Sequence, residues 1–247
     1  MFNESIPTID LPGYTLVKKF TSRKNSVFLV ENTVDDDKPK YLVYKKYAYS
    51  ERMQAETEML RLLKVKGVAV PEIYWTGQDH LLLEYIEGPL LLDCYCRQED
   101  TCDHLDASTH QLIIRLCSWF KDFYSAVQSI YGKQILMGDV NFRNFIIGEK
   151  VFGLDLEECH EGRIEKEVGS LCAFALTYNP SFTMWKMAIV SDLIRVFTYE
   201  LNLDRKILQK EVENELLFLA QIRGTVEKIN IFLATNSLDN IFKYNGS

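Results

Sequence analysis

The sequence lacks an excess of positive charge, a long apolar run and a paired-cysteine motif, and each absence narrows the class of protein. The formal net charge is −7, whereas a protein whose main partner is nucleic acid needs a basic face to bind phosphates. No uninterrupted apolar run approaches the roughly 18 residues that indicate a membrane-spanning helix. Residues 1–4 show neither the basic nor the apolar segment of a signal peptide. We therefore expect a cytoplasmic protein that binds neither nucleic acid nor a membrane.

The six cysteines form no CxxC pair. Cys94, Cys96, Cys102 and His104 are close enough in sequence to form a zinc cluster, but their spacing is irregular for such a site. Free or buried thiols in a reducing compartment are the alternative, and the spacing favours it.

The first third of the chain alternates short apolar segments with polar turns, a pattern typical of β-strands. Strands are predicted at residues 14–17, 26–30, 41–45 and 81–86, and a further strand is predicted to start within residues 67–74. The first two are joined by a polar, basic tip, residues 20–25, that contains no glycine. Lys45 ends the third strand, and Glu56 lies in a helix that is predicted to begin near Ser50. Both side chains can be solvated, but a helix packed against the strand would bring Glu56 to the Lys45 ammonium.

The remainder of the chain is predominantly helical in pattern, and the change falls at the sequence Glu87-Gly88-Pro89. A long helix is expected from Asp106, which can cap it. Helices are also predicted at residues 167–177, 180–201 and 203–222, and in a final segment that ends near residue 242. With 247 residues the chain can form two lobes, which we predict at 1–87 and 88–247.

One stretch, residues 138–155, has the spacing of a phosphoryl-transfer site. Asp139 and Asn144 are five residues apart at the end of a loop, and an apolar hairpin then leads to Asp155. This spacing suits one base and two metal ligands.

The order of these motifs resembles that of the protein-kinase-like fold. A strand lysine and a helix glutamate come first, followed by the sequence Gly-Asp-Val-Asn-Phe-Arg-Asn and then by Leu-Asp-Leu-Glu. The resemblance covers about residues 14–176. It is to the branch of aminoglycoside and choline phosphotransferases, and also to the small RIO-type kinases. It implies a bilobal α+β fold with a small antiparallel β-sheet N-lobe that carries one helix, and a mainly helical C-lobe. It also implies an ATP- and Mg²⁺-dependent phosphotransferase that moves the γ-phosphate to an alcohol group of a small molecule.

The resemblance further implies a role for each matching residue. Asp139 would orient the acceptor hydroxyl and take its proton, and Arg143 would either offset charge on the moving phosphoryl group or pair with a structural carboxylate. Asn144 and Asp155 would bind Mg²⁺, with Glu157 in support. The residues that would hold the nucleotide are Lys45, its partner Glu56, the backbone of Glu84, Tyr85 and Ile86, and the hairpin-tip side chains of Ser22 and Lys24.

Three departures from the family pattern leave alternatives open. Met137 stands where the family usually has a histidine, and can replace its packing but not its hydrogen bonds. The hairpin tip has no glycine to let the backbone approach phosphates. Only ten residues separate Asn144 from Asp155, and no Ala-Pro-Glu segment follows. The missing peptide-docking segment favours a small-molecule acceptor, and the acidic helices after Asp155 would admit a cationic one. The alternatives are a RIO-type protein kinase and a pseudokinase that acts as a binding module.

Overall fold

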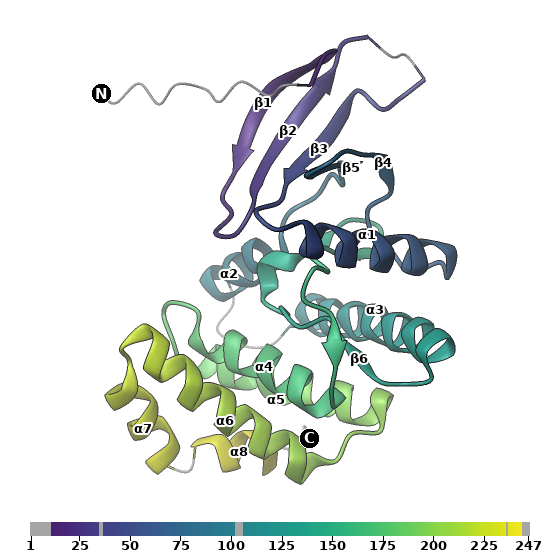
Figure 1. Ribbon diagram of the computed structural model, residues 1–247. Coiled ribbons are helices and arrows are strands. Elements are labelled where there is room, and N and C mark those ends of the chain that lie inside the picture. Colours follow the sequence, from purple (N-terminus) through teal and green to yellow (C-terminus); the bar gives the residue numbers. More distant parts are fainter. Residues whose placement is uncertain (1–10, 35–36, 102–105, 236, 244–247) are drawn as a thin grey trace, which may run out of the picture.

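The computed structural model describes residues 11–34, 37–101, 106–235 and 237–243, which form a β-rich N-lobe above a helical C-lobe (Figure 1). The N-lobe holds one antiparallel sheet in the order β1-β2-β3-β5-β4. Its elements are β1 (Tyr14–Phe20), β2 (Ser26–Asn32), β3 (Tyr41–Lys46), α1 (Ser50–Val65), β4 (Ile73–Thr76) and β5 (His80–Glu84). The predicted bilobal α+β class is therefore confirmed. The lobe boundary predicted at residues 87 and 88 falls between β5 and the first helix of the C-lobe.

The two faces of this sheet bury different residues, as the alternation of side chains along a strand requires. Leu42 and Tyr44 of β3 belong to a small apolar cluster on one face. Leu81 and Leu83 of β5 pack with α1 in the main core. Lys45 lies opposite Leu81 in the register of β3 and β5. It therefore faces α1.

The C-lobe is built around one central helix, α3 (Ala107–Tyr131). Asp106 caps it as expected, because its side chain accepts from the Thr109 backbone N–H at 2.8 Å. The remaining helices are α2 (Leu91–Thr101), α4 (Ile164–Thr177), α5 (Met184–Leu201), α6 (Arg205–Arg223), α7 (Val226–Ala234) and α8 (Ser237–Lys243). The short elements are β6 (Ile135–Leu136), the 3₁₀ turn η1 (Phe142–Asn144), β7 (Phe145–Ile147), β8 (Val151–Gly153) and β9 (His160–Glu161).

Several predicted boundaries were wrong. Helix α2 was not expected at all, and β5 ends at Glu84 rather than at residue 86. Helix α5 begins only at Met184, where the Thr183 side chain caps it. Helix α6 ends at Arg223, next to its predicted end, and Gly224 caps it in a left-handed conformation with φ of 65°. The chain then forms two further helices where one was predicted.

The aromatic residues of α3 connect the two lobes. Trp119, Phe120 and Phe123 are buried in the main core. The Trp119 indole N–H donates to the backbone carbonyl of Ala69 at 2.8 Å, and the Gly153 N–H donates to the same carbonyl at 3.2 Å. The Trp119 ring lies where a Cβ on residue 153 would stand, which explains the glycine at that position. One N-lobe carbonyl is thus held by two groups of the C-lobe.

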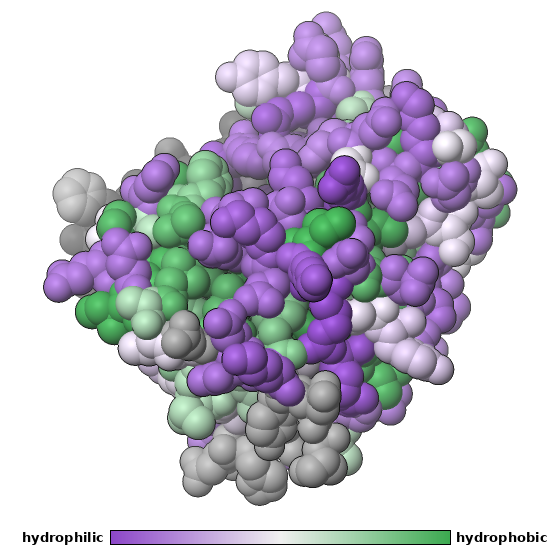
Figure 2. All heavy atoms as spheres, turned by 90° about the horizontal axis from the view of Figure 1, so that it is seen from below, coloured by the Kyte–Doolittle hydropathy of each residue, from purple (hydrophilic) through white to green (hydrophobic). Residues whose placement is uncertain are grey.

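The surface of the C-lobe is mixed in character. Apolar areas lie among polar ones on the face seen from below (Figure 2). Helices α6 and α7 expose Phe218, Ile222 and Ile231. Across the described ranges, none of the helices combines the length and the hydropathy that a membrane crossing needs.

Candidate active site

The first component of the site is a buried ion pair between β3 and α1. Lys45 Nζ donates to Glu56 Oε2 and to Asp155 Oδ1, each at 2.6 Å, and the Tyr47 hydroxyl donates to Glu56 Oε2 at 2.7 Å. The side chains of Lys45 and Glu56 are 8% and 2% exposed. The expected contact is therefore present, and neither side chain is solvated.

The charge state of this pair follows from its surroundings. Burial lowers the pKa of the Lys45 ammonium, but the attraction of Glu56 and Asp155 outweighs burial and raises the pKa above its ordinary value. Lys45 is therefore a fixed positive charge near neutral pH. Because removing one partner leaves an uncompensated buried charge, each member depends on the other.

The second component is the loop that carries Asp139. Gly138 has φ of 91°, and the Glu158 carbonyl occupies the place of a Cβ there, so only glycine fits. The Asn144 side-chain amide donates to the Asp139 backbone carbonyl at 2.8 Å. The Asn141 amide donates to Asp139 Oδ1 at 2.6 Å. These bonds fix the loop, and neither of them uses Asp139 Oδ2.

The loop is anchored from below by a residue that sequence reasoning missed, Glu167 of α4. Its carboxylate accepts from the Gly138 N–H at 2.8 Å and from the Tyr124 hydroxyl at 2.6 Å. Burial raises the pKa of Glu167 to about 7, although hydrogen bonds from Tyr124 and from the Gly138 and Met137 backbone lower it. Met137 itself is fully buried. Glu167 therefore holds the backbone at Met137 and Gly138, and its sequence signal was an acid on an otherwise apolar helix face.

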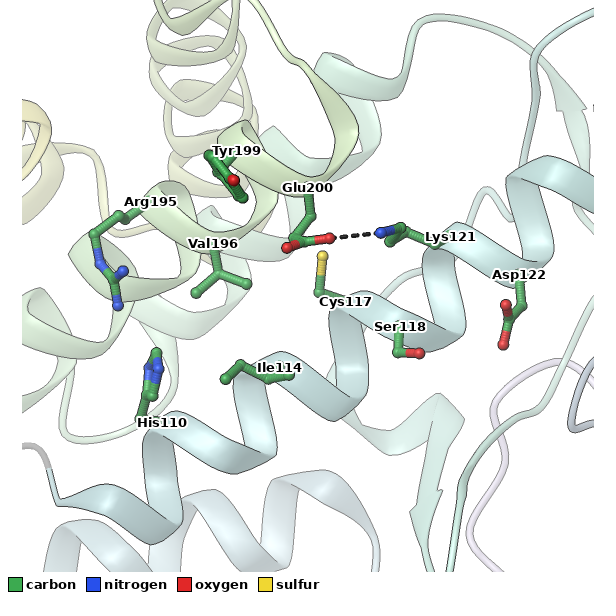
Figure 3. Close-up of a pocket in the computed structure, with 10 residues that line it drawn as sticks. All are labelled: His110, Ile114, Cys117, Ser118, Lys121, Asp122, Arg195, Val196, Tyr199 and Glu200. Atoms are coloured by element: carbon green, nitrogen blue, oxygen red, sulfur yellow. Dashed lines mark hydrogen bonds and ion pairs between the residues drawn. The ribbon is translucent and has the colours of Figure 1, made fainter.

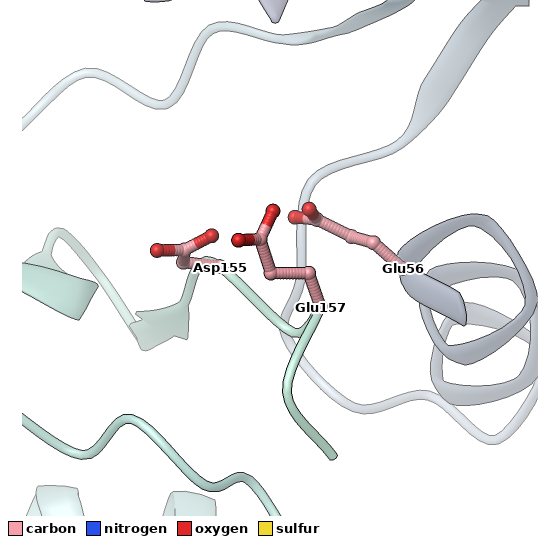
Figure 4. A group of neighbouring side chains, drawn as sticks. All are labelled: Glu56, Asp155 and Glu157. Atoms are coloured by element: carbon pink, nitrogen blue, oxygen red, sulfur yellow. The ribbon is translucent and has the colours of Figure 1, made fainter. Parts of the chain in front are cut away.

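The third component is a cluster of carboxylates. Ligand atoms of Glu56, Asp155 and Glu157 lie within 4.8 Å of one another, and their carboxylates point toward one another (Figure 4). Asp155 follows β8, where the Leu154 N–H donates to the Asn144 carbonyl at 2.8 Å, so the two predicted metal ligands emerge side by side. Asp155 adopts φ of 60°, an uncommon conformation for a residue other than glycine. The hairpin of β7 and β8 that was predicted to return this aspartate is present.

The donor set fits a magnesium ion. Carboxylate and amide oxygens are the ligands that Mg²⁺ prefers. Within the described ranges, Asp155 Oδ2 and the Asn144 side-chain oxygen have no hydrogen-bond partner, while the other oxygen of Asp155 is held by Lys45. Asn144 and Asp155 can therefore hold the ion. Glu157 is less free, because it accepts from Asn25 Nδ2 at 2.6 Å and from the Arg52 guanidinium at 2.9 Å.

The hairpin tip lies against this cluster. Lys24 Nζ donates to Glu158 Oε1 at 2.6 Å and lies 4.0 Å from Asp139 Oδ2. The Ser22 hydroxyl accepts from the Asn25 N–H at 3.3 Å, so its hydrogen bond lies within the hairpin tip itself. Burial raises the pKa of Glu158, but hydrogen bonds from Lys24 and Arg52 outweigh it and leave the pKa below its ordinary value.

The other predicted site residues lie on the margins. The Glu84 carboxylate accepts from the Glu72 N–H at 3.0 Å, so this side chain holds the backbone just before the edge strand β4. Tyr85 is partly exposed and Ile86 is buried in the connection between the lobes. The Arg143 side chain is exposed, and its charge lowers the pKa of Tyr178, whose pKa burial raises to about 12. The Tyr178 hydroxyl accepts from the Phe142 N–H at 2.8 Å, so Arg143 lies on the outer side of the same loop.

Two other features do not join this site. A cavity of about 500 Å³ lies between α3 and α5 (Figure 3), and three of its charged groups are paired, Lys121 with Glu200 at 2.5 Å and Arg195 with Asp192. Cys94 and Cys96 are free thiols, and in the parts of the chain that the structure describes no metal-binding group forms around them. Cys102 and His104 of the possible zinc cluster lie outside the described residues.

Comparison with known proteins gives one distant similarity. No family model matches the chain. Over 104 residues the chain is 27% identical to the EKC/KEOPS complex subunit BUD32 of Encephalitozoon cuniculi, a stretch that covers 42% of this chain and 45% of that protein. The similarity supports the protein-kinase-like fold and a kinase-like phosphotransferase, and does not confirm the aminoglycoside and choline phosphotransferase branch. Because less than half of that protein is covered, the match carries no acceptor or partner with it.

Proposed function

We propose that this protein is an ATP- and Mg²⁺-dependent kinase of the compact, atypical protein-kinase type, which transfers the γ-phosphate to a hydroxyl group of a protein. The observation that carries the proposal is the contact of Lys45 with both Glu56 and Asp155 at 2.6 Å, which joins residues 110 positions apart beside Asp139. The similarity to a protein named as a complex subunit supports a role within an assembly. It favours the alternative interpretation over the small-molecule acceptor that the sequence placed first.

The charge of the cleft supports the use of a divalent cation. Its hydrogen bonds and ion pairs join more carboxylates than cations. The carboxylates are Glu56, Asp139, Asp155, Glu157 and Glu158, and the cations are Lys24, Lys45 and Arg52. This excess of negative charge would repel a triphosphate. A bound Mg²⁺ would supply the missing positive charge at the β- and γ-phosphates.

The side chains of the protein would bind the phosphates and accept the proton. Lys45, held rigid by Glu56, would bind the α- and β-phosphates. The acceptor oxygen would attack the γ-phosphorus as its proton passes to Asp139 Oδ2, and the bond to the bridging oxygen of ADP would break with its electron pair. Asn141 holds the other oxygen of Asp139, so the carboxylate would present a fixed face to the acceptor. Most of the rate acceleration in such a site comes from position and charge.

A small-molecule hydroxyl compound is the second candidate for the acceptor. Only residues 156–163 separate Asp155 from α4, too few for the long segment that docks peptides in conventional protein kinases. This observation also suits compact RIO-type enzymes. The two candidates therefore differ in the acceptor alone.

A thermal-shift titration with ATP and Mg²⁺ tests the first step. Ligand binding to the folded state stabilises it by RT ln(1 + [L]/Kd), so a shift is expected. Asp139→Asn should keep this shift and lose transfer, whereas Glu149→Gln, an exposed control beyond the loop, should keep both. A flat titration would refute nucleotide use.

Transfer from labelled ATP to a generic protein and to a panel of small hydroxyl compounds tests the acceptor. Labelling of protein only is the expected result. Labelling of small compounds only would replace the protein acceptor, and binding without any transfer would leave a pseudokinase.

A further inference from the structure

The tip of the β1–β2 hairpin is attached by side chains to the segment that follows Asp155. Lys24 pairs with Glu158 at 2.6 Å, and Asn25 donates to Glu157 at 2.6 Å. Glu158 also accepts from Arg52 of α1 at 2.8 Å. Two separate N-lobe elements, the tip and the first turn of α1, therefore meet at one pair of C-lobe acids.

This attachment gives Lys24 a special place relative to the loop. Lys24 Nζ lies 4.0 Å from Asp139 Oδ2. In the parts of the chain that the structure describes, it is the one cation within this distance of Asp139. Between Asp139 and Asn144 the loop offers Val140, Asn141, Phe142 and Arg143; the first three are uncharged and the Arg143 side chain is exposed. The cation that lies within 4.0 Å of the proposed base thus comes from the other lobe.

The composition of the tip explains why a side chain is needed. Residues 21–25 contain no glycine, so the close backbone approach by which glycine-rich loops hold phosphates is not available. The long, flexible side chain of a lysine can cover the same distance. It must then be kept in place, because an unrestrained lysine loses much conformational entropy on fixing its charge.

We propose that Glu158 is a positioning residue that holds Lys24 beside Asp139, so that the hairpin tip supplies positive charge to the phosphoryl group in transfer. This inference rests on the proposed kinase function. An ammonium has three donors, so Lys24 can donate to phosphate oxygens in the cleft while it stays on Glu158, and Arg52 pairs with the same carboxylate.

The same ion pair contributes little to the stability of the fold. The Lys24 and Glu158 side chains are 44% and 31% exposed, and exposed ion pairs are worth little in water. Variants at these positions should therefore fold, which makes the proposal open to kinetic test.

The kinetic test compares Lys24→Met, Lys24→Arg and Glu158→Gln with two controls, Lys19→Met on the same hairpin and Glu161→Gln, both at exposed positions. Lys24→Met should lower kcat at least tenfold while the melting temperature and the thermal shift with ADP stay unchanged. Lys24→Arg should restore most of kcat, because it keeps the charge. Glu158→Gln should lower kcat several-fold at constant KM for the acceptor. A rise in kcat for Glu158→Gln would identify the contact as an inhibitory latch and overturn the proposal, as would unchanged kcat for Lys24→Met.

Amide hydrogen exchange tests the positioning itself, independently of activity. Glu158→Gln should raise exchange across residues 20–27 in the protein without nucleotide, whereas Glu161→Gln should not. Equal exchange in the two variants would show that Glu158 does not hold the tip. If the wild-type protein gave no thermal shift with ATP while this difference in exchange persisted, the kinase function would fail and the positioning contact would stand.

Discussion

Glu167 makes the anchoring of the loop that carries Asp139 sensitive to pH. The side chain is 3% exposed, and burial raises its pKa to about 7 in the folded protein, against an ordinary value near 4.5. The folded state therefore holds this proton more tightly than the unfolded chain does. The stability contributed by the protonated carboxyl is fully present below about pH 4.5 and is lost as the pH rises through about 7.

The size of the effect follows from linkage. With these two pKa values, Glu167 alone should lower the free energy of unfolding by about 2.5 kcal/mol between pH 5 and pH 8. Glu167→Gln removes the titration and keeps the geometry, because a glutamine oxygen can accept from the Gly138 N–H while its amide donates to the Tyr124 hydroxyl.

Urea unfolding of the wild type and Glu167→Gln at pH 5 and pH 8 measures this difference. Other groups titrate in both proteins, so the quantity of interest is the extra pH dependence of the wild type. Glu161→Gln, which removes an exposed carboxylate from the preceding strand, serves as the control and should behave like the wild type. If the wild type and Glu167→Gln lose stability in parallel from pH 5 to pH 8, Glu167 does not titrate near neutrality, and burial does not raise its pKa to about 7.

Three further substitutions test other parts of the structure. Lys45→Met should abolish the nucleotide-induced thermal shift and, because it leaves Glu56 buried without its cation, should cost about 3–5 kcal/mol in denaturant unfolding; Lys40→Met, at an exposed lysine, should do neither. Gly138→Ala should lower stability by about 1–3 kcal/mol and turnover severely, because φ is 91° and the Glu158 carbonyl fills the space; wild-type turnover in this variant would show that the loop relaxes freely. Trp119→Phe should cost more than about 1 kcal/mol in urea unfolding, because it removes the bond to Ala69 and leaves a cavity in the core, and an unchanged midpoint would contradict both.

The N-lobe was predictable from local pattern because each of its elements has a strong signal. Alternation marked β3, and the helix that follows it had to cover the same face, which brings Lys45 to Glu56 within 11 residues of sequence. The hairpin that returns Asp155 was equally local. Such contacts depend on strand and helix periodicity, which a single sequence displays directly.

The missed features depend on contacts between distant segments. Glu167 meets Gly138 across 29 residues, and Lys24 meets Glu158 across 134, so no local pattern predicts either pair. Helix α2 was missed although it is amphipathic, since Leu91 and Tyr95 lie one turn apart and are both buried. The end of α6, in contrast, was predicted to within one residue, and Gly224 after the helical run is a common C-terminal signal.

The Ala69 carbonyl, held by Trp119 and Gly153, has a mechanical consequence. It follows the C-terminal end of α1, whereas the hairpin tip shares Glu158 with Arg52 in the first turn of that helix. Helix α1 ends at Val65, 13 residues after Arg52, so about 20 Å of helix lies between Arg52 and the end of α1 that leads to Ala69. If the carbonyl acts as the pivot and α1 as the lever, a rotation of about 10° between the lobes moves the tip by about 3.5 Å. The back of the cleft would then stay closed while the tip alone opens a path for nucleotide to enter and leave.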